Sequence, residues 1–297
     1  MRVAHDPERP DEDVVVSRVV APTPAPDDER PAAVAHAGAD VVSGVYEGGL
    51  KVWEGSVDLL RYVAATRPAA RRVLELGCGH GLCGIGALLA CPGVGEVVFQ
   101  DLNTEALELA TWPNVALNTA DHDPPPSCRY FAGTWEALAE QLAEAGETFD
   151  LILAAECTYT AEAAAAVAAT VAALLADGGT ALVCGKRYYF GTGGGSDAFT
   201  FAAASLGLDV VRGAARAASS GPRYACSFFL TRSFVCFRRR PTWKTTGRTT
   251  SGTCCPCGGR RREASRAGPA RRATWRRWRW RWAGRAASST SDDDAGE

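Results

Sequence analysis

The sequence has no run of about eighteen consecutive apolar residues, the length that a membrane-spanning helix requires. Its first residues, MRVAHDPERPDEDVVV, are acidic, contain proline and lack the apolar core of a secretory signal. The hydrophobic fraction of 46% is nevertheless ordinary for a globular protein. We therefore expect a globular protein with no transmembrane segment, no secretory signal and no membrane partner.

The eleven cysteines follow no regular spacing. In a chain of 297 residues without a secretory signal, this favours reduced and packed thiols over a disulfide framework. Cys254 and Cys257 form a single Cys-x-x-Cys pair with no second pair nearby, whereas a structural zinc site needs a fuller set of ligands. We therefore expect no bound metal.

Charge is distributed unevenly along the chain. Residues 1–240 contain 19 Lys/Arg and 29 Asp/Glu, whereas residues 241–297 contain 13 and 5, together with five of the eight tryptophans. This change in composition divides the chain into three parts. We expect a polar, disordered leader over residues 1–40, one folded domain over residues 41–240, and a basic, Arg/Trp-rich, low-complexity tail over residues 241–297 that is disordered.

Strand and helix patterns alternate within the central part of the chain. The expected strands, which are short apolar runs, cover residues 71–77, 95–101, 128–133, 148–156, 180–186, 208–214 and 226–237. The expected helices cover residues 82–90, 104–112, 135–146, 161–179 and 196–207, and glycines end the fourth of them. This alternation predicts an α/β fold whose mostly parallel sheet is covered by helices on both faces. The last two strands have no helix between them, so we expect a C-terminal antiparallel hairpin. The layout resembles that of the Rossmann-like seven-strand methyltransferases.

The stretch LELGCGHGLCGIG, residues 74–86, places several glycines between an expected strand and an expected helix. Such glycines let backbone amides approach a ligand, and the helix N-terminus adds further donors. Asp101 ends the next expected strand, where an acid can accept both ribose hydroxyls of a nucleoside. A flexible connector is the alternative for the glycines alone, but the four features together favour a nucleoside site. The spacing Gly77-x-Gly79-x-Gly81 after Glu75 favours S-adenosylmethionine over NAD, whose fingerprint is G-x-G-x-x-G.

Several segments together resemble the eukaryotic protein-histidine methyltransferases. They are VYEGGLKVWEGSVDLL, VLELGCGHGLCGI, FQDLN with WPNVALN, ECTY, and YYFGTGGGSDAF, and the resemblance runs from about Val45 to Phe237. It implies an S-adenosylmethionine-dependent enzyme that methylates a histidine of a large-subunit ribosomal protein, uL3 in the family member that the chain resembles. The implied partner is thus a basic, His-containing ribosomal protein. We further expect a monomer located in the cytoplasm and the nucleus.

The resemblance also implies a set of cofactor contacts. They are Val52, Trp53, Glu54, Gly55, Ser56, Glu75, Gly77, Gly79, Asp101, Leu102, Asn103, Gly133, Thr134 and Trp135. Trp53 is suited to stack on adenine or to flank the sulfonium, and a core aromatic beneath the sheet is an equal alternative. Thr134 stands where the family has an acid, which makes the adenine contact less secure.

The segment Glu156-Cys157-Thr158-Tyr159 ends the fourth expected strand and resembles the acid-x-x-Tyr signature of the family. The resemblance makes Glu156 and Tyr159 the candidate catalytic residues. Glu156 is suited to accept the N–H of an imidazole and to stabilise the cation that methylation creates. The alternative is a plain helix start, with Thr160 as its cap.

The loop Tyr189–Gly195 has the composition of a linker. Its position beyond the fifth expected strand favours a different interpretation, since ligands bind at that edge of a sheet. We expect Tyr188, Tyr189 and Phe190 to hold a flat ring by stacking while the glycines admit a peptide backbone.

Three functions remain open at this point. The first is a protein-histidine methyltransferase, and the second is a protein-lysine methyltransferase of the same group. The third is an inactive protein that binds S-adenosylmethionine or RNA, in which the tail is the functional part. The segment ATWRRWRWRWAGR in the tail is suited to RNA by stacking and phosphate contacts, or to an acidic membrane surface. Because the resemblance ends before the tail, we favour a disordered extension or a misread exon over a functional module.

Overall fold

The structure, a computed structural model, describes residues 2–4, 14–16, 47–213, 232–238 and 274–276. An eight-stranded sheet in the order β10-β5-β4-β3-β6-β7-β9-β8 forms its centre. The strands are β3 (Arg72–Leu76), β4 (Glu96–Asp101), β5 (Ser127–Ala132), β6 (Phe149–Ala155), β7 (Leu175–Lys186), β8 (Asp209–Gly213), β9 (Arg232–Arg238) and β10 (Thr274–Arg276). The strands from β3 to β7 run parallel to one another, which confirms the expected α/β fold with a mostly parallel sheet.

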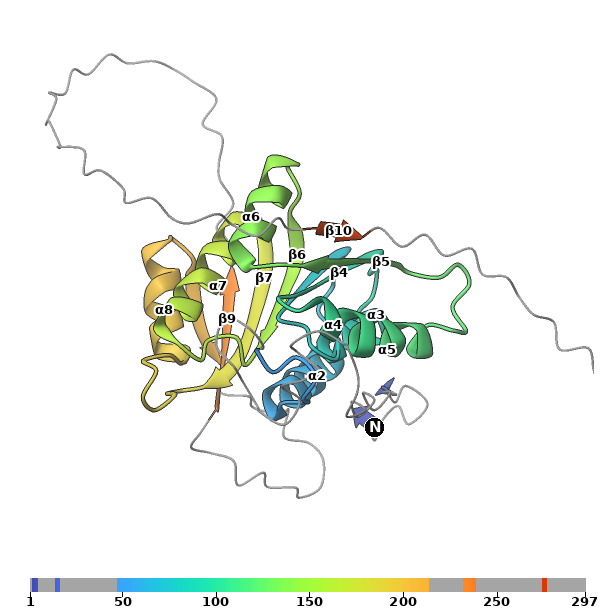
Figure 1. Cartoon of the computed structure of the whole chain (residues 1–297), viewed down its shortest axis with the longest axis horizontal. Coiled ribbons are helices and arrows are strands. Elements are labelled where there is room, and N and C mark those ends of the chain that lie inside the picture. The colour runs from blue at the N-terminus through green and yellow to red at the C-terminus, as the bar shows by residue number, and fades with distance from the viewer. Residues whose placement is uncertain (1, 5–13, 17–46, 214–231, 239–273, 277–297) are drawn as a thin grey trace, which may run out of the picture.

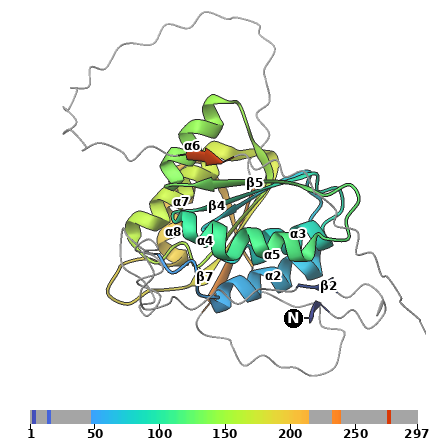
Figure 2. The same ribbon diagram turned by 45° about the vertical axis from the view of Figure 1, so that its right-hand side comes forward.

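Helices cover both faces of the sheet (Figure 1). On one side lie α2 (Glu54–Thr66), α3 (Leu82–Ala90), α4 (Thr104–Ala106) and α5 (Trp112–Asn118), and on the other lie α6 (Trp135–Glu144), α7 (Ala161–Leu174) and α8 (Ser196–Ser205). The turned view in Figure 2 shows the same two layers. A doubly covered sheet of this kind leaves the ends of its strands as the accessible edges.

Side chains of the parallel strands alternate between two apolar cores. In β3, Leu74 and Leu76 pack in the core beneath α6, α7 and α8, whereas Val73 packs in the core beneath α2 and α3. In β6, Ile152 and Leu151 divide in the same way. Because successive side chains point to opposite faces, a strand buried on both faces is a continuous apolar run. That pattern is what made these strands recognisable in the sequence.

Two helices on the same face of the sheet differ from the expectation. No helix was expected over Glu54–Thr66, yet α2 forms there and buries Leu59, Leu60 and Val63 on one face. The helix expected over residues 104–112 continues to Asn118 through a π-helical turn, Leu107–Thr111. Pro113, which directly follows the first residue of α5, does not end it.

The helix expected over residues 161–179 ends earlier than predicted. It stops at Leu174, and β7 begins at Leu175, which is buried and pairs with Phe149. The ladder between β6 and β7 then shifts register before Leu151 pairs with Thr180. The glycines at 178 and 179 therefore lie in an irregular stretch of strand and do not end a helix.

Parts of the terminal segments are also described. Arg2–Ala4 (β1) and Val14–Val15 (β2) pair antiparallel, and Val16 is buried against α2 and α3, within the segment expected to be a disordered leader. From the tail, only β10 is described, and it pairs antiparallel with β5. β9 pairs antiparallel with both β7 and β8, while the connection over residues 214–231 lies outside the described residues, as does the Cys254–Cys257 pair.

The six cysteines within residues 47–213 are free thiols. Five of them are buried, namely Cys78, Cys83, Cys91, Cys157 and Cys184, and Cys128 is half-buried. This confirms the expectation of reduced, packed thiols for that part. Within the same residues, no helix is long and apolar enough to span a membrane, and no group of His, Cys, Asp and Glu side chains is arranged to hold a metal ion.

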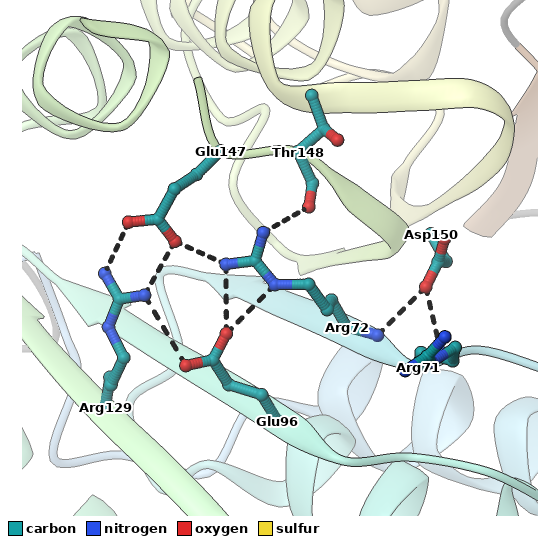
Figure 3. A network of polar contacts seen from close by, with 7 residues as sticks. All are labelled: Arg71, Arg72, Glu96, Arg129, Glu147, Thr148 and Asp150. Carbon is teal, nitrogen blue, oxygen red and sulfur yellow. Dashed lines mark hydrogen bonds and ion pairs between the residues drawn. The ribbon is translucent and has the colours of Figure 1, made fainter. Parts of the chain in front are cut away.

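A network of ion pairs ties four strand starts together at the amino edge of the sheet (Figure 3). Arg72 contacts Glu96 at 3.0 Å and also bonds Glu147, while Arg129 donates to Glu147 at 2.7 and 3.1 Å. Asp150 accepts the backbone amides of the neighbouring residues 71 and 72. The hydrogen bonds from Arg129 lower the pKa of Glu147. The Glu147 carboxylate therefore stabilises the fold at pH values above the ordinary carboxyl pKa, and this contribution is lost as the pH falls through the lowered pKa.

The change Glu147→Gln should lower the free energy of unfolding by about 1–2 kcal/mol, since hydrogen bonds to charged groups contribute about 1.5–3 kcal/mol and this carboxylate is partly exposed. Urea denaturation at neutral pH measures the effect. Asp58→Asn is the matched control, because Asp58 forms an exposed ion pair with Arg61. Its cost should be below about 1 kcal/mol. Equal costs for the two variants would show that the network adds nothing beyond a surface pair.

Candidate functional site

The predicted site residues gather at the carboxyl edge of the sheet, opposite the ion-pair network. Along the chain, β4 is added beside β3 and β5 beside β4, and β6 is then placed on the opposite side of β3. In a sheet of parallel strands, ligands bind at such a reversal. Gly77 and Cys157, which follow β3 and β6, meet there: a Cβ built on Gly77 would lie 2.7 Å from the Cys157 Sγ.

The glycine turn between β3 and α3 requires its glycines. Gly77, Gly79 and Gly81 have φ angles of 56°, 50° and 69°, a backbone region that L-residues rarely adopt. A Cβ on Gly79 would lie 2.8 Å from the carbonyl oxygen of Gly49, so that position also lacks the space for a side chain. The turn is therefore a tightly packed structure and no flexible connector.

Asp101 ends β4 beside this turn and is buried. Its Oδ2 accepts the amide of Gly79 at 2.9 Å, and its Oδ1 accepts the amide of Asn103 at 3.1 Å. A carboxylate has further acceptor capacity after two such bonds, so a ribose contact remains compatible with this geometry. Burial raises the pKa of Asp101 from 3.8 to about 6, although the amide hydrogen bonds oppose the shift.

Glu75 lies in β3, just before the glycine turn, and its carboxylate faces α3. Its oxygens accept the amides of Cys83 at 3.2 Å and Gly84 at 2.8 Å, two donors at the N-terminus of that helix. Burial raises the pKa of Glu75 to about 7, against the effect of these amides. Glu75 thus holds the helix that follows the glycine turn, and its contact with the cofactor stays a prediction.

Residues 47–53, which we call the covering segment, lie over the glycine turn. The carbonyl oxygen of Leu50 is 2.9 Å from the His80 Nε2, and the Glu47 amide lies 3.4 Å from the Asn103 Oδ1. Trp53 donates its indole N–H to the Gly48 carbonyl at 3.0 Å, so it belongs to this segment and is not a core aromatic beneath the sheet.

The remaining predicted contacts near the covering segment differ in exposure. Val52 and Ser56 are half-buried, and Gly55 is buried at the start of α2. Glu54, in contrast, is exposed to solvent. All of residues 52–56 except Glu54 are therefore at least partly buried, and their contacts with the cofactor stay predictions.

Gly133, Thr134 and Trp135 follow β5 with distinct roles. The Thr134 hydroxyl accepts the Ala137 amide at 3.3 Å and caps α6, which accounts for a threonine at this position. The Trp135 ring points toward Gly77, and its indole nitrogen is buried with no hydrogen-bond partner among the described residues. A buried donor of this kind needs a partner, so the indole N–H is a candidate ligand contact.

Sequence reasoning missed Gln100, which links two parts of the site. Its side-chain oxygen accepts the Gly77 amide at 2.9 Å, and its side-chain nitrogen donates to the Gly133 carbonyl at 2.7 Å. Gln100 is buried next to Asp101 in β4. A buried amide beside the predicted acid was the signal that would have identified it.

Glu156 follows β6 and has an unusual backbone conformation. Its φ angle is 58°, and apart from glycines only Arg67 shares such a value among the described residues. A Cβ on Gly55 would lie 2.4 Å from the Glu156 Oε1, so the start of α2 packs directly on this carboxylate. The other oxygen accepts the hydroxyl hydrogen of Tyr189. Strain in a non-glycine residue is typical of functional sites.

Tyr159, the second candidate catalytic residue, points to the covering segment. Its hydroxyl donates to the Glu47 Oε2 at 2.9 Å, and burial together with Glu47 raises its pKa above the usual range. The Tyr159 hydroxyl thus contacts Glu47 of the covering segment. Its role in this geometry is to hold the covering segment against β6.

The loop Tyr189–Gly195 is packed against the segment that follows β6. Gly195 donates its amide to the Thr158 carbonyl at 2.7 Å, and a Cβ on Gly194 would lie 2.4 Å from that carbonyl. The expected aromatic slot does not form as predicted, because only Tyr189 turns inward. Tyr188 and Phe190 are exposed, at 54% and 98%.

Comparison with known proteins adds a family and several relatives. The family model described as "Lysine methyltransferase" matches residues 42–191. Proteins named histidine protein methyltransferase 1 homolog are 36% identical over 185 residues in Bos taurus and 37% identical over 159 residues in Dictyostelium discoideum. These matches cover 54% and 52% of this chain and 49% and 48% of the relatives, so the chain spans about half the length of the curated relatives it matches. A calmodulin-lysine N-methyltransferase of Arabidopsis thaliana is 31% identical over 129 residues, with 40% of this chain and 39% of that protein covered.

The change Gly79→Ala should weaken the binding of S-adenosylmethionine at least about tenfold, a cost of about 1.4 kcal/mol. The new Cβ would displace the covering segment at Gly49. Gly146→Ala is the matched control, since Gly146 also has a positive φ, 66°, but nothing lies within 4 Å of a Cβ built there. Calorimetric titration of both folded variants measures the difference. Equal affinities would contradict a site beneath the covering segment.

The pKa of Asp101 predicts a pH dependence of stability. Its raised value means that its stabilising contribution is present below about pH 4 and is lost as the pH rises through about 6. Asp101→Asn removes this titration. The free energy of unfolding of the wild type, relative to that of this variant, should therefore fall by about 1 kcal/mol or more from about pH 4 to about pH 7.5. Urea denaturation at both pH values tests this, with the exposed Glu140→Gln as control. A difference that stays constant with pH would contradict the shifted pKa.

Proposed function

The chain belongs to the lysine methyltransferase family, and on that premise we propose that it is a methyltransferase that acts on a histidine side chain of a protein. The cofactor is S-adenosylmethionine, which supplies an electrophilic methyl group on its sulfonium when it is bound. The observation that carries the proposal is the placement of Glu156. Glu156 follows β6, which pairs with the strand that leads into the glycine turn, and it has a strained backbone conformation.

The residues at this edge fit the cofactor. The buried indole N–H of Trp135 lacks a partner within the described part of the chain, and its ring lies next to Gly77 of the glycine turn. Asp101 offers further acceptor capacity at the end of β4, where ribose hydroxyls are commonly bound. The amides of Gly77, Gly79 and Gly81 already donate to Gln100, Asp101 and Cys78, so the turn offers bare backbone rather than open amide donors. Trp135, Asp101 and the glycine turn would therefore hold the nucleoside, and the covering segment would exclude water from it.

Glu156 supports histidine as the target. A histidine is largely neutral at pH 7, so its unprotonated nitrogen is nucleophilic without a prior proton transfer. The Glu156 carboxylate would accept the N–H of the other ring nitrogen, which selects the tautomer and stabilises the positive charge that develops. Holding the ring in line with the methyl group supplies a large part of the rate, since orientation can lower a barrier by about 7–11 kcal/mol.

Lysine is the second candidate target. The description of the family model and the relative from Arabidopsis thaliana, named a calmodulin-lysine N-methyltransferase, favour it. A lysine must first lose a proton from a group of pKa about 10.4, which asks the same carboxylate to act as a base. The relatives with the highest identity reported above carry a histidine methyltransferase name, and for that reason we prefer histidine.

The substrate protein that we propose is a large-subunit ribosomal protein. Residues 41–240 contain 20 Asp/Glu and 15 Lys/Arg, a balance that does not repel a basic partner. With such a substrate, cytoplasm and nucleus are the expected locations, and a monomer is sufficient for the site as described. We also propose that the sheet is of the seven-strand type, with β8 and β9 as its C-terminal hairpin.

The third hypothesis, an inactive protein that binds the cofactor or RNA, depends on the tail, of which only β10 is described. The strained Glu156 speaks against it, because a protein that only binds the cofactor has no need of a carboxylate held in this way.

The change Glu156→Gln keeps the shape of the side chain and removes its charge. It should lower the transfer rate by about 10²–10⁴-fold, the range for a positioned acid–base group, and leave cofactor affinity nearly unchanged. Glu162→Gln is the matched control, because Glu162 is exposed in the first turn of α7. Single-turnover assays with labelled S-adenosylmethionine measure both variants. An unchanged rate for Glu156→Gln would remove this residue from the reaction.

Target choice is tested with three arginine-rich peptides that differ at one position, which is histidine, lysine or alanine. A ribosomal protein fraction with and without replacement of the labelled residue extends the test to proteins. Transfer to the histidine peptide supports the proposal. Transfer to the lysine peptide favours the second candidate, and no transfer to any peptide or ribosomal protein favours the third.

A further inference from the structure

We propose that Tyr189 is the residue that positions the Glu156 carboxylate, an inference that rests on the proposed function of that site. The Tyr189 hydroxyl donates to the Glu156 Oε2. Tyr189 turns inward, whereas its neighbours Tyr188 and Phe190 are exposed; we call these three residues the aromatic loop. The aromatic loop thus serves the acid and does not form a stacking slot for the substrate ring. Tyr189 acts through Glu156 and is a positioning residue.

The backbone first aims Glu156 into the site. The amide of Glu156 donates to the Cys184 carbonyl of β7 at 2.7 Å, and its φ angle of 58° turns the side chain out of the line of β6. Left-handed backbone is unfavourable for an L-residue, so packing must hold it there. Gly55 leaves the space that the carboxylate occupies, because any side chain at this position would overlap it.

Tyr189 is itself held from several sides. Its hydroxyl accepts the Lys186 amide at 3.3 Å, and its own amide donates to the Gly194 carbonyl at 3.3 Å. Thr192 donates its hydroxyl to the backbone carbonyls of both Tyr189 and Tyr159, which ties the loop to the segment after β6. The loop is therefore a fixed support for the ring and not a linker.

The contacts also determine which atom carries the proton. Burial, followed by the charge of Glu156, raises the pKa of Tyr189, so the phenol remains a donor at neutral pH. With the phenol proton directed at Oε2, one carboxylate oxygen is held in place and the orientation of the other is defined.

Gly185 is close by, since a Cβ there would lie 3.2 Å from the Tyr189 hydroxyl oxygen and 3.1 Å from the Thr158 Oγ1. Thr158 is buried, and its hydroxyl has no hydrogen-bond partner in the described residues.

A double-mutant cycle on the full chain tests the inference. Tyr189→Phe removes only the hydroxyl and should lower kcat by about 10- to 100-fold, with KM for the peptide and affinity for S-adenosylmethionine nearly unchanged. In the Glu156→Gln background, the same change should lower kcat less than about twofold, because a residue that acts through the carboxylate has no effect once its charge is gone. Tyr188→Phe, on the exposed neighbour, is the matched control and should leave kcat unchanged.

A merely structural role would give a different result. In that case Tyr189→Phe would lower kcat equally in both backgrounds, which would overturn the inference while leaving the proposed function intact. Gly185→Ala provides a second perturbation, since it presses on the same hydroxyl, and it should show the same dependence on Glu156. If Glu156→Gln alone has no effect on transfer, the role of the acid fails first and the positioning role fails with it.

Discussion

Buried carboxylates hold the backbone turn on which the rest of the site depends. Asp101 accepts the amide of Gly79, and Glu75 accepts the amides of Cys83 and Gly84 at the start of α3. These oxygens satisfy backbone donors that would otherwise be buried without partners. Because the turn is held in this way, the covering segment can pack directly on its bare backbone at Gly79.

The two edges of the sheet use charge differently. At the amino edge, Arg72 and Arg129 neutralise the carboxylates that face them, and the pKa of Glu147 is lowered. At the carboxyl edge, Glu75 and Asp101 accept amides and have no cationic partner among the described residues, and burial raises both pKa values. The first arrangement stabilises the start of four strands. The second concentrates acceptors where a cationic, hydroxyl-bearing cofactor would bind.

Much of the fold and part of the site could be predicted from the sequence, and the errors have physical causes. Apolar runs identified the parallel strands, because a strand buried on both faces is continuously apolar. The end of α7 was misplaced because the glycines at 178 and 179 signal a helix end locally, whereas pairing with Phe149 draws Leu175 into the sheet. Gln100 and the contact between Tyr189 and Glu156 were missed, since both join segments that are distant in the chain.

The sequence by itself determined the strand–helix alternation, the glycine turn, the acid that ends β4 and the acid that follows β6, because these depend on residue type and short spacing. Only the tertiary structure decided what each acid does. Glu75 accepts amides at the start of a helix, and Asp101 accepts an amide of the glycine turn. Glu156 accepts the hydroxyl of Tyr189, which comes from a loop that has the composition of a linker. The reason is that a carboxylate takes its role from the donors that reach it, and those donors come from strands brought together by the sheet order.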